Sequence, residues 1–292
     1  MCDGGSENHD VSVVVLTKNS ARTIKECILS VLSQEPLEII AVDGMSTDST
    51  ISLLEYYGVR IIPDPSLSLG RARQVGVEAA RAKYVVFVDS DVELTADCIM
   101  TLRNELEKNG WVGIHARLLS KENLSYWQRA VDTSRHLYGF DRAGVKRAIG
   151  TVAALFRRDI LLGHPFDSAM VESCEDVDLC WRLRRENDLV GVSTAIAYHY
   201  HRRGFQDFVK QRFRDGIGNA RLSLKYRERR RLIKPFGADP SIVVPTLAST
   251  RITLVPYFVV SRVTKLAGML YGLRIRSVKL SGKRPRLQPF GK

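Results

Sequence analysis

Two aspartates that follow an apolar run are the first candidates for chemistry. Asp89 and Asp91 stand one residue apart, directly after residues 84–88, with Ser90 between them. This spacing places both carboxylates near one turn, and carboxylate oxygens are ligands that Mg2+ and Mn2+ prefer. The pair therefore indicates a divalent-metal site, and an ordinary turn after a strand is the alternative.

A second acidic pair, Glu175 and Asp176, stands directly ahead of a helical pattern of apolar residues. A carboxylate at the start of a helix can lie in a cleft and take a proton from a hydroxyl group. The helix dipole also favours acids in a first turn without any catalytic role. The pair is therefore a candidate general base or plain helix-terminal charge.

Strand and helix patterns alternate along the first third of the chain, where short β-branched runs are separated by apolar residues at helical spacing. This alternation predicts βαβ units and an α/β fold with a doubly wound sheet. The expected strands are 11–19, 37–44, 59–65 and 83–91, and the expected helices are 20–34, with Ser20 as its cap, 46–58 and 68–82.

Polar residues end three of the expected strands. Thr17 and Asn19 end the first, Asp43 the second, and Asp89 with Asp91 the fourth. Ligands of such sheets bind beyond the carboxyl ends of the strands, so we expect these residues on one rim. Thr17, Asn19 and Asp43, each taken alone, are more often ordinary turn or cap residues, so the shared position of all five residues carries the prediction.

Four motifs in this order resemble the inverting nucleotide-sugar glycosyltransferases of family 2. They are VSVVVLTKN, EIIAVDGMSTDST, GRARQVGVEAARAKYVVFVDSD and CEDVDLCWRLR, and the similarity runs over residues 10–205. The resemblance implies a Rossmann-like GT-A fold, with a mixed, mainly parallel sheet flanked by helices. It also implies transfer of a sugar from a nucleotide-diphosphate donor with inversion.

The resemblance assigns donor contacts at the first two motifs and at the arginine of the third. Thr17, Asn19 and Asp43 would hold the nucleobase and ribose, and Arg73 would approach the donor nucleotide. Gln74 replaces the asparagine usual in the family, which leaves the role of that neighbour open.

The metal and the base follow from the other two motifs of the resemblance. Asp89, Ser90 and Asp91 would bind the diphosphate with Mg2+ or Mn2+, and Asp91 is the first choice as a direct ligand. Asp176 would be the catalytic base, with Glu175 beside it. An acceptor that is already a phosphate would need no base, and Asp176 would then mainly orient.

Three further positions bear on the comparison with the family. His199 is a candidate metal ligand, and a strand histidine without a ligand role is the alternative. Met45 stands where the family often has glycine. Residues 211–216, QRFRDG, lack the tryptophan of the QxxRW-like motif in processive members, which favours single additions.

The basic character of the chain, net +12, lies in its last third. Residues 202–292 hold 22 Lys and Arg against 4 Asp and Glu, whereas residues 1–201 hold 22 against 28. We expect a GT-A catalytic domain over 10–204, with a nucleotide-sugar half (10–98) and an acceptor half (99–204). Residues 205–292 are expected to be a basic, amphipathic helical region.

This basic region suggests peripheral contact with an anionic membrane surface and a glycan or lipid-linked acceptor. Packing of residues 241–276 back on the core is the alternative. Nucleic acid is not expected as a partner, because no module that reads bases accompanies the charge.

The cysteines and the first residues favour a reducing, cytoplasmic location, and the basic last third suggests the cytoplasmic face of a membrane as the place within it. Five cysteines form no CxxC pair, residues 1–10 are unlike a signal peptide, and no apolar run is long enough to span a bilayer.

Two other functions compete with sugar transfer. A nucleotidyltransferase would share the sheet and the acids, but residues 17–23 lack the glycine-rich loop that such enzymes show after the first strand. A non-catalytic nucleotide-binding protein of the same fold is the other alternative, and the presence of both acidic motifs counts against it.

Overall fold

The computed structural model describes residues 8–121, 124–201, 204–226 and 253–274. Two compact units form the chain. The first contains Met1–Ser168 and Glu175–Gly204, and the second contains Ala169–Cys174 and Phe205–Lys292. This division into two units does not test the prediction that residues 10–98 bind the nucleotide sugar and residues 99–204 bind the acceptor.

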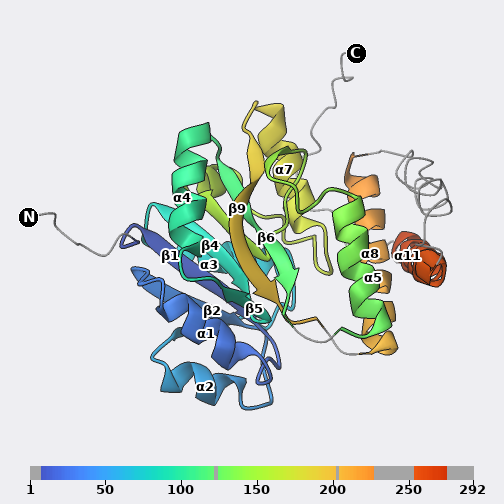
Figure 1. The fold of residues 1–292 in the computed structure, drawn as a ribbon, viewed down its shortest axis with the longest axis horizontal. Coiled ribbons are helices and arrows are strands. Elements are labelled where there is room, and N and C mark those ends of the chain that lie inside the picture. The colour runs from blue at the N-terminus through green and yellow to red at the C-terminus, as the bar shows by residue number, and fades with distance from the viewer. Residues whose placement is uncertain (1–7, 122–123, 202–203, 227–252, 275–292) are drawn as a thin grey trace, which may run out of the picture. The chain divides into compact units, whose positions relative to one another are not determined.

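One mixed sheet organises the first unit, in the order β3-β2-β1-β4-β8-β6-β9-β5 with β7 paired to β9 (Figure 1). β1 to β4 are parallel to one another, whereas β8 runs antiparallel to β4 and β6. The strands are β1 (Val11–Thr17), β2 (Glu38–Asp43), β3 (Arg60–Pro63), β4 (Tyr84–Asp89), β5 (Val92–Leu94), β6 (Gly113–Ser120), β7 (Gly144–Lys146), β8 (Ala153–Arg157) and β9 (Val190–His199).

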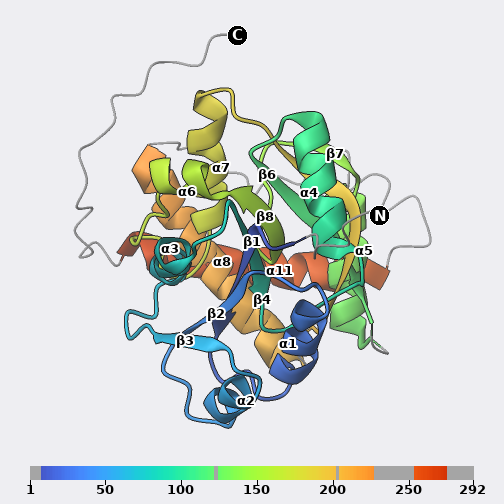
Figure 2. The same ribbon diagram turned by 90° about the vertical axis from the view of Figure 1, so that its left-hand side faces the viewer.

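Helices cover both faces of this sheet, with α1 and α4 on one side and α3, α6 and α7 on the other (Figure 2). The expected α/β architecture with its βαβ units is confirmed. The helices of the first unit are α1 (Ile24–Leu32), α2 (Thr50–Tyr56), α3 (Leu69–Ala79), α4 (Cys98–Asn109), α5 (Tyr126–Leu137), α6 (Arg158–Gly163) and α7 (Glu175–Arg185).

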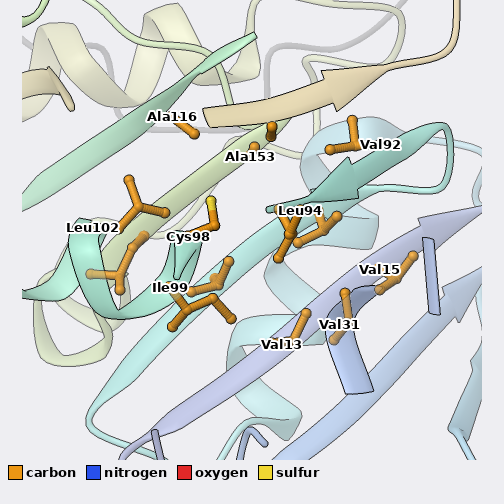
Figure 3. Packing of buried hydrophobic residues seen from close by; sticks show 14 of the residues in the cluster. Val13, Val15, Val31, Val92, Leu94, Cys98, Ile99, Leu102, Ala116 and Ala153 are labelled. Atoms are coloured by element: carbon orange, nitrogen blue, oxygen red, sulfur yellow. The ribbon is translucent and has the colours of Figure 1, made fainter. Parts of the chain in front are cut away.

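Each face of the sheet has its own hydrophobic core, because successive strand residues point to opposite faces. Val13 and Val15 of β1 pack with Val31 of α1 and Ile99 of α4 in one core (Figure 3). Val14, between them, belongs to the other core, with residues of α3, α6 and α7. Burial on both sides holds the strand ends, and the polar residues on them, in fixed positions.

The expected role of Ser20 as a helix cap was wrong. Helix α1 begins at Ile24, with Thr23 at its N-cap position. The hydroxyl of Ser20 instead bonds with that of Ser90 at 2.7 Å, and its backbone N–H donates to Thr50 Oγ1. Ser20 therefore links the first strand end to the acidic motif after β4.

The second unit contains α8 (Phe205–Tyr226) and α11 (Val255–Arg274), which pack against each other. Helix α8 runs through Gly216 and Gly218 as one continuous helix. A Cβ at Gly216 would collide with the backbone carbonyl of Lys265 on α11, and one at Gly218 with Ser173. The glycines therefore permit close packing.

None of the helices in the described part of the chain is long and apolar enough to cross a bilayer.

Candidate functional site

Thr17 and Asp43 lie side by side at the carboxyl ends of β1 and β2, where the strand register pairs them. Thr17 Oγ1 donates to Asp43 Oδ1 at 2.8 Å, and both side chains are buried. The Asp43 carboxylate also accepts from the backbone N–H of Ser46 at 2.7 Å and from its hydroxyl at 2.6 Å. The carboxylate thus organises the loop after β2 and faces the rim predicted for the donor.

Asn19 joins the loop after β1 to the same loop. Its backbone N–H donates to Ser46 Oγ at 2.8 Å, and its side-chain oxygen accepts from the N–H of Thr47 at 2.8 Å. The structure therefore brings Thr17, Asn19 and Asp43 together in one hydrogen-bonded pair of loops. Their contact with a nucleotide stays a prediction.

Met45 occupies the left-handed backbone region, at φ 61°, in this loop. Glycine adopts that conformation without a steric cost, whereas a residue with a Cβ does not. The turn is therefore retained at a position where the family often has glycine, and its conformation is strained.

Asp89, Ser90 and Asp91 lie at the end of β4, within the same sheet. The Asp89 backbone N–H donates to the Val152 carbonyl at 2.8 Å, and the carbonyl of Asp91 accepts from the Tyr200 N–H at 2.8 Å. Backbone bonds from two other segments thus fix the acidic motif. This support positions both carboxylates before any ligand binds.

Arg73 connects the two acidic motifs. Its Nη2 lies 3.3 Å from Asp89 Oδ1, and its Nη1 lies 2.8 Å from Glu175 Oε1. The side chain is only 4% exposed, so it is not the solvated helix arginine that α3 alone would suggest. Arg73 therefore holds the motif after β4 against the start of α7, and its contact with a donor stays a prediction.

Asp176 stands in the first turn of α7, next to Glu175. Burial raises the pKa of Asp176 to about 7, the negative charge of Glu175 adds to the rise, and Arg73 opposes it. Burial likewise raises the pKa of Asp89, against the opposing charge of Arg73. A carboxyl that titrates near neutrality is suited to accept a proton from a reacting hydroxyl.

Two groups of this cluster have unsatisfied polar atoms. Arg73 Nε and Glu175 Oε2 are buried without a hydrogen-bond partner among the described residues. Buried polar groups are usually satisfied, so each such exception needs an explanation. A polar ligand that enters the cluster would supply the missing partners.

His199 ends β9 beside the acidic motif. Its Nε2 lies 3.5 Å from Asp91 Oδ1, and its buried Nδ1 has no hydrogen-bond partner within the described ranges. Its ring packs edge-on against that of His201, with 4.7 Å between the centroids. The structure thus brings two of the candidate metal ligands, Asp91 and His199, close together.

The chemistry of this pair fits a divalent ion, since carboxylate oxygen and imidazole nitrogen both bind Mn2+. Asp89 is turned to Arg73, and within the described ranges no three or more His, Cys, Asp or Glu side chains form a complete metal site. Further ligands would have to come from the phosphates of the donor. The ligand roles of Asp89, Asp91 and His199 remain predictions.

Sequence patterns gave no indication of His115 near this cluster. His115, inside β6, is buried, and burial together with the charge of Arg135 lowers its pKa to about 3. A Cβ at Gly150 would lie 3.6 Å from His115 Nε2 and 3.7 Å from Asp176 Oδ2, so both side chains border Gly150. His115 and Gly150 are far apart in the sequence and adjacent only in the fold, so no local sequence pattern indicates their contact.

His201 follows His199 by two residues in the sequence, and it supports the His199 ring. Its Nε2 lies 2.8 Å from Asp132 Oδ1 of α5 and 2.7 Å from Ser120 Oγ at the end of β6. These contacts fix the ring that packs against His199.

Gln74, which replaces the usual asparagine, has a structural role. Its side-chain oxygen accepts from the backbone N–H of Phe166 at 3.0 Å, and its amide nitrogen donates to Glu78 at 3.0 Å. Both ends of the side chain are therefore bonded to groups outside the two acidic motifs.

Part of this sequence is similar to the sequences of known proteins. The succinoglycan biosynthesis protein ExoO of Rhizobium meliloti is 37% identical over 110 residues, which are 34% of this chain and 29% of that protein. The putative glycosyltransferase EpsH of Bacillus subtilis is 32% identical over 105 residues, or 33% of this chain and 30% of that protein. The aligned segment thus spans less than a third of these relatives.

Solved structures match over a larger share of the chain. The mannosyltransferase PcManGT of Pyrobaculum calidifontis, solved with GDP-Man and Mn2+, has a TM-score of 0.67 at 14% identity and covers 92% of this chain and 88% of that one. S. aureus TarS 1-349, solved with UDP-GlcNAc, has a TM-score of 0.53 at 17% identity and covers 90% of both chains. At these identities the matches show the fold.

The sequence match to a family is more extensive than the match to any relative named above. The model of glycosyl transferase family 2 matches residues 12–162, which contain β1 to β4, Arg73 and the Asp89–Asp91 motif. This is more than half of the chain. The protein therefore belongs to glycosyl transferase family 2.

Proposed function

We propose that this protein transfers a sugar from a nucleotide-diphosphate donor to an acceptor hydroxyl, with inversion and in single additions. One observation carries the proposal: buried Arg73 bridges Asp89, beside the expected metal ligand, and Glu175, beside the expected base. This bridge supports the proposal, because it would hold the expected diphosphate site close to the expected proton acceptor, as a displacement at the sugar requires.

Asp176 is the proton acceptor in this proposal. The acceptor oxygen forms a bond to the anomeric carbon, the bond from that carbon to the phosphate oxygen breaks, and the hydroxyl proton passes to Asp176. Its pKa near 7 makes it a base at neutral pH that is strong enough to assist this transfer. The ion pair of Arg73 with Glu175 fixes the start of α7, where Asp176 stands.

The donor contacts assigned here are Thr17, Asn19, Asp43, Arg73, Asp89 and Ser90. Asp91, Asp89 and His199 would hold Mg2+ or Mn2+, and the nucleotide phosphates would complete the coordination. When bound, the ion stabilises the charge that develops on the leaving nucleoside diphosphate, as a Lewis acid. The Mn2+ in the PcManGT complex supports this assignment by analogy of fold.

The acceptor proposed is a growing polysaccharide or a lipid-linked glycan. Residues 10–98 would bind the nucleotide sugar and residues 99–204 the acceptor, while residues 205–292 would contact the cytoplasmic face of an anionic membrane. The concentration of Lys and Arg in the last third supports the membrane contact. The name of ExoO, a succinoglycan biosynthesis protein, supports the polysaccharide.

Assays of UDP-, GDP- and dTDP-sugars with Mn2+ or Mg2+, which measure release of the nucleoside diphosphate, test the proposal. We expect Asp91→Ala to lose metal-dependent donor binding in calorimetry, and Asp176→Ala to bind the donor but turn it over slowly. The matched control is Asp97→Ala, at an exposed position before α4. The proposal would be refuted if, in the presence of Mn2+ or Mg2+, no donor bound to the protein and none was turned over.

A further inference from the structure

The outward face of α11 is apolar over most of its length. Val259, Val263 and Leu270 recur at helical spacing, and they are 54%, 63% and 58% exposed. Side chains separated by four, seven or eleven residues lie on one side of a helix, and exposed Ala267 falls on the same side. The three large side chains therefore form one continuous stripe, called here the α11 stripe.

The opposite face of α11 is committed to α8. A Cβ at Gly268 would collide with the Phe213 carbonyl of α8, which shows how closely the two backbones approach. Lys265, in the middle of α11, also points to this side, with its Nζ 4.0 Å from Asp215 Oδ2. Lys265 thus faces α8, whereas Arg262, the other charge in the middle of the helix, is half-buried and directly precedes Val263. The three large side chains of the α11 stripe face outward.

The charge of the sequence segments before and after α11 indicates the kind of surface that the α11 stripe meets. Helix α11 contains no acidic residue. Residues 227–234 carry five Lys and Arg against one Glu, and residues 275–292 carry six without an acid. An apolar helix face with cationic residues before and after it in the sequence is complementary to a bilayer with anionic headgroups.

We propose that the α11 stripe docks on an anionic lipid bilayer, with the helix axis in the plane of the interface. This rests on the membrane contact proposed above and is independent of sugar transfer. Stable protein dimers usually bury about 800 Å² on each partner. Three half-exposed side chains on one helix offer less than that, which favours lipid over a second copy.

Flotation of the full chain with phosphatidylcholine vesicles, with and without an equal part of phosphatidylglycerol, tests the stripe. The variant carries Val259→Gln, Val263→Gln and Leu270→Gln, which remove apolar surface without changing charge. We expect its affinity for the anionic vesicles to fall about thirty-fold or more, from the apolar area that no longer inserts. Light scattering without lipid should show the same mass for both proteins.

The matched control variant carries Leu29→Gln, Leu32→Gln and Leu162→Gln, three exposed leucines of the first unit. It should bind vesicles as the wild type does. Unchanged binding of the α11 variant would overturn the assignment, even where the wild type binds through its basic segments. If the wild type were a dimer and the α11 variant a monomer, the lipid assignment would be overturned, and the α11 stripe would instead bind a second copy of the chain.

Insertion of the stripe is measured separately, with vesicles whose acyl chains carry bromine. These chains quench tryptophans that reach the hydrocarbon, so Val263→Trp should show quenching beyond the wild type and Leu29→Trp should not. Equal quenching of the two variants would overturn the proposal. Donor turnover in vesicle-free buffer, which should be unaltered in the α11 variant, separates this result from a failure of the proposed activity.

Discussion

Single residues at the rim combine structural and chemical demands. The Asp43 carboxylate accepts bonds from Thr17 and Ser46, and Arg73 neutralises parts of two acidic motifs. Loop order and site chemistry therefore depend on the same side chains, so a loss of activity in their variants needs a stability control. Met45 and Asp176 allow the two effects to be separated.

Met45→Gly should stabilise the protein. The left-handed backbone costs an L-residue roughly 1–2 kcal/mol, while glycine loses roughly 0.5–1 kcal/mol through its freer unfolded chain. The side chain is 56% exposed, so its removal loses little packing. We expect a gain of about 0.5–1 kcal/mol in the free energy of unfolding, measured in urea.

Met45→Ala is the control for this change, because alanine keeps the Cβ that causes the strain. It should give no gain. An equal stabilisation by both variants would show that the methionine side chain, and not its backbone, is unfavourable at this position.

Asp176→Asn should lower turnover by about 10²–10⁴-fold, the usual contribution of a general base, with donor binding retained. The pH profile gives an independent check. The raised pKa means that wild-type turnover should increase with pH through about 7 and level off above it. A variant that loses donor binding and turnover equally would contradict the role of Asp176 as base.

At the scale of elements, the predictable features are those that repeat locally. The valines of β1 and the apolar spacing of α1 predicted strand and helix, and strand ends placed Thr17, Asp43 and the acids on one rim. The bridge made by Arg73 was not predictable, because one helix arginine carries no sign of burial. His115 and the pair of His201 with Asp132 arise from contacts distant in sequence.

Gly216→Ala should destabilise the packing of α8 on α11. The added Cβ meets backbone atoms of Lys265 and Met269, which cannot move aside as a flexible side chain can. We expect a loss of about 1–3 kcal/mol, as for other overpacked contacts, with faster hydrogen exchange in both helices. Gly163→Ala, where a Cβ would meet open space, is the control and should leave exchange unchanged.

For the molecule as a whole, the acidic cluster opposes stability at neutral pH. Asp89, Glu175 and Asp176 lie near Arg73, which is buried with Glu175 while the two aspartates are half-buried, so one cation faces three acids. Binding of a cation and of polar donor groups would relieve this excess. A site that is unfavourable when empty is a common cost of function.

Asp176→Asn should therefore raise the melting temperature of metal-free protein at pH 8. The folded-state pKa of Asp176 is raised from 3.8 to about 7, so between these values the folded chain holds a proton that the unfolded chain releases. The contribution of Asp176 to the free energy of unfolding therefore falls as pH rises through that window. Above pH 7 the destabilisation by its ionised carboxylate is fully present. At pH 4 the variant and the wild type should melt alike, as calorimetry can measure. A gain at pH 4 as large as that at pH 8 would mean that packing, and not ionisation, explains the stabilisation.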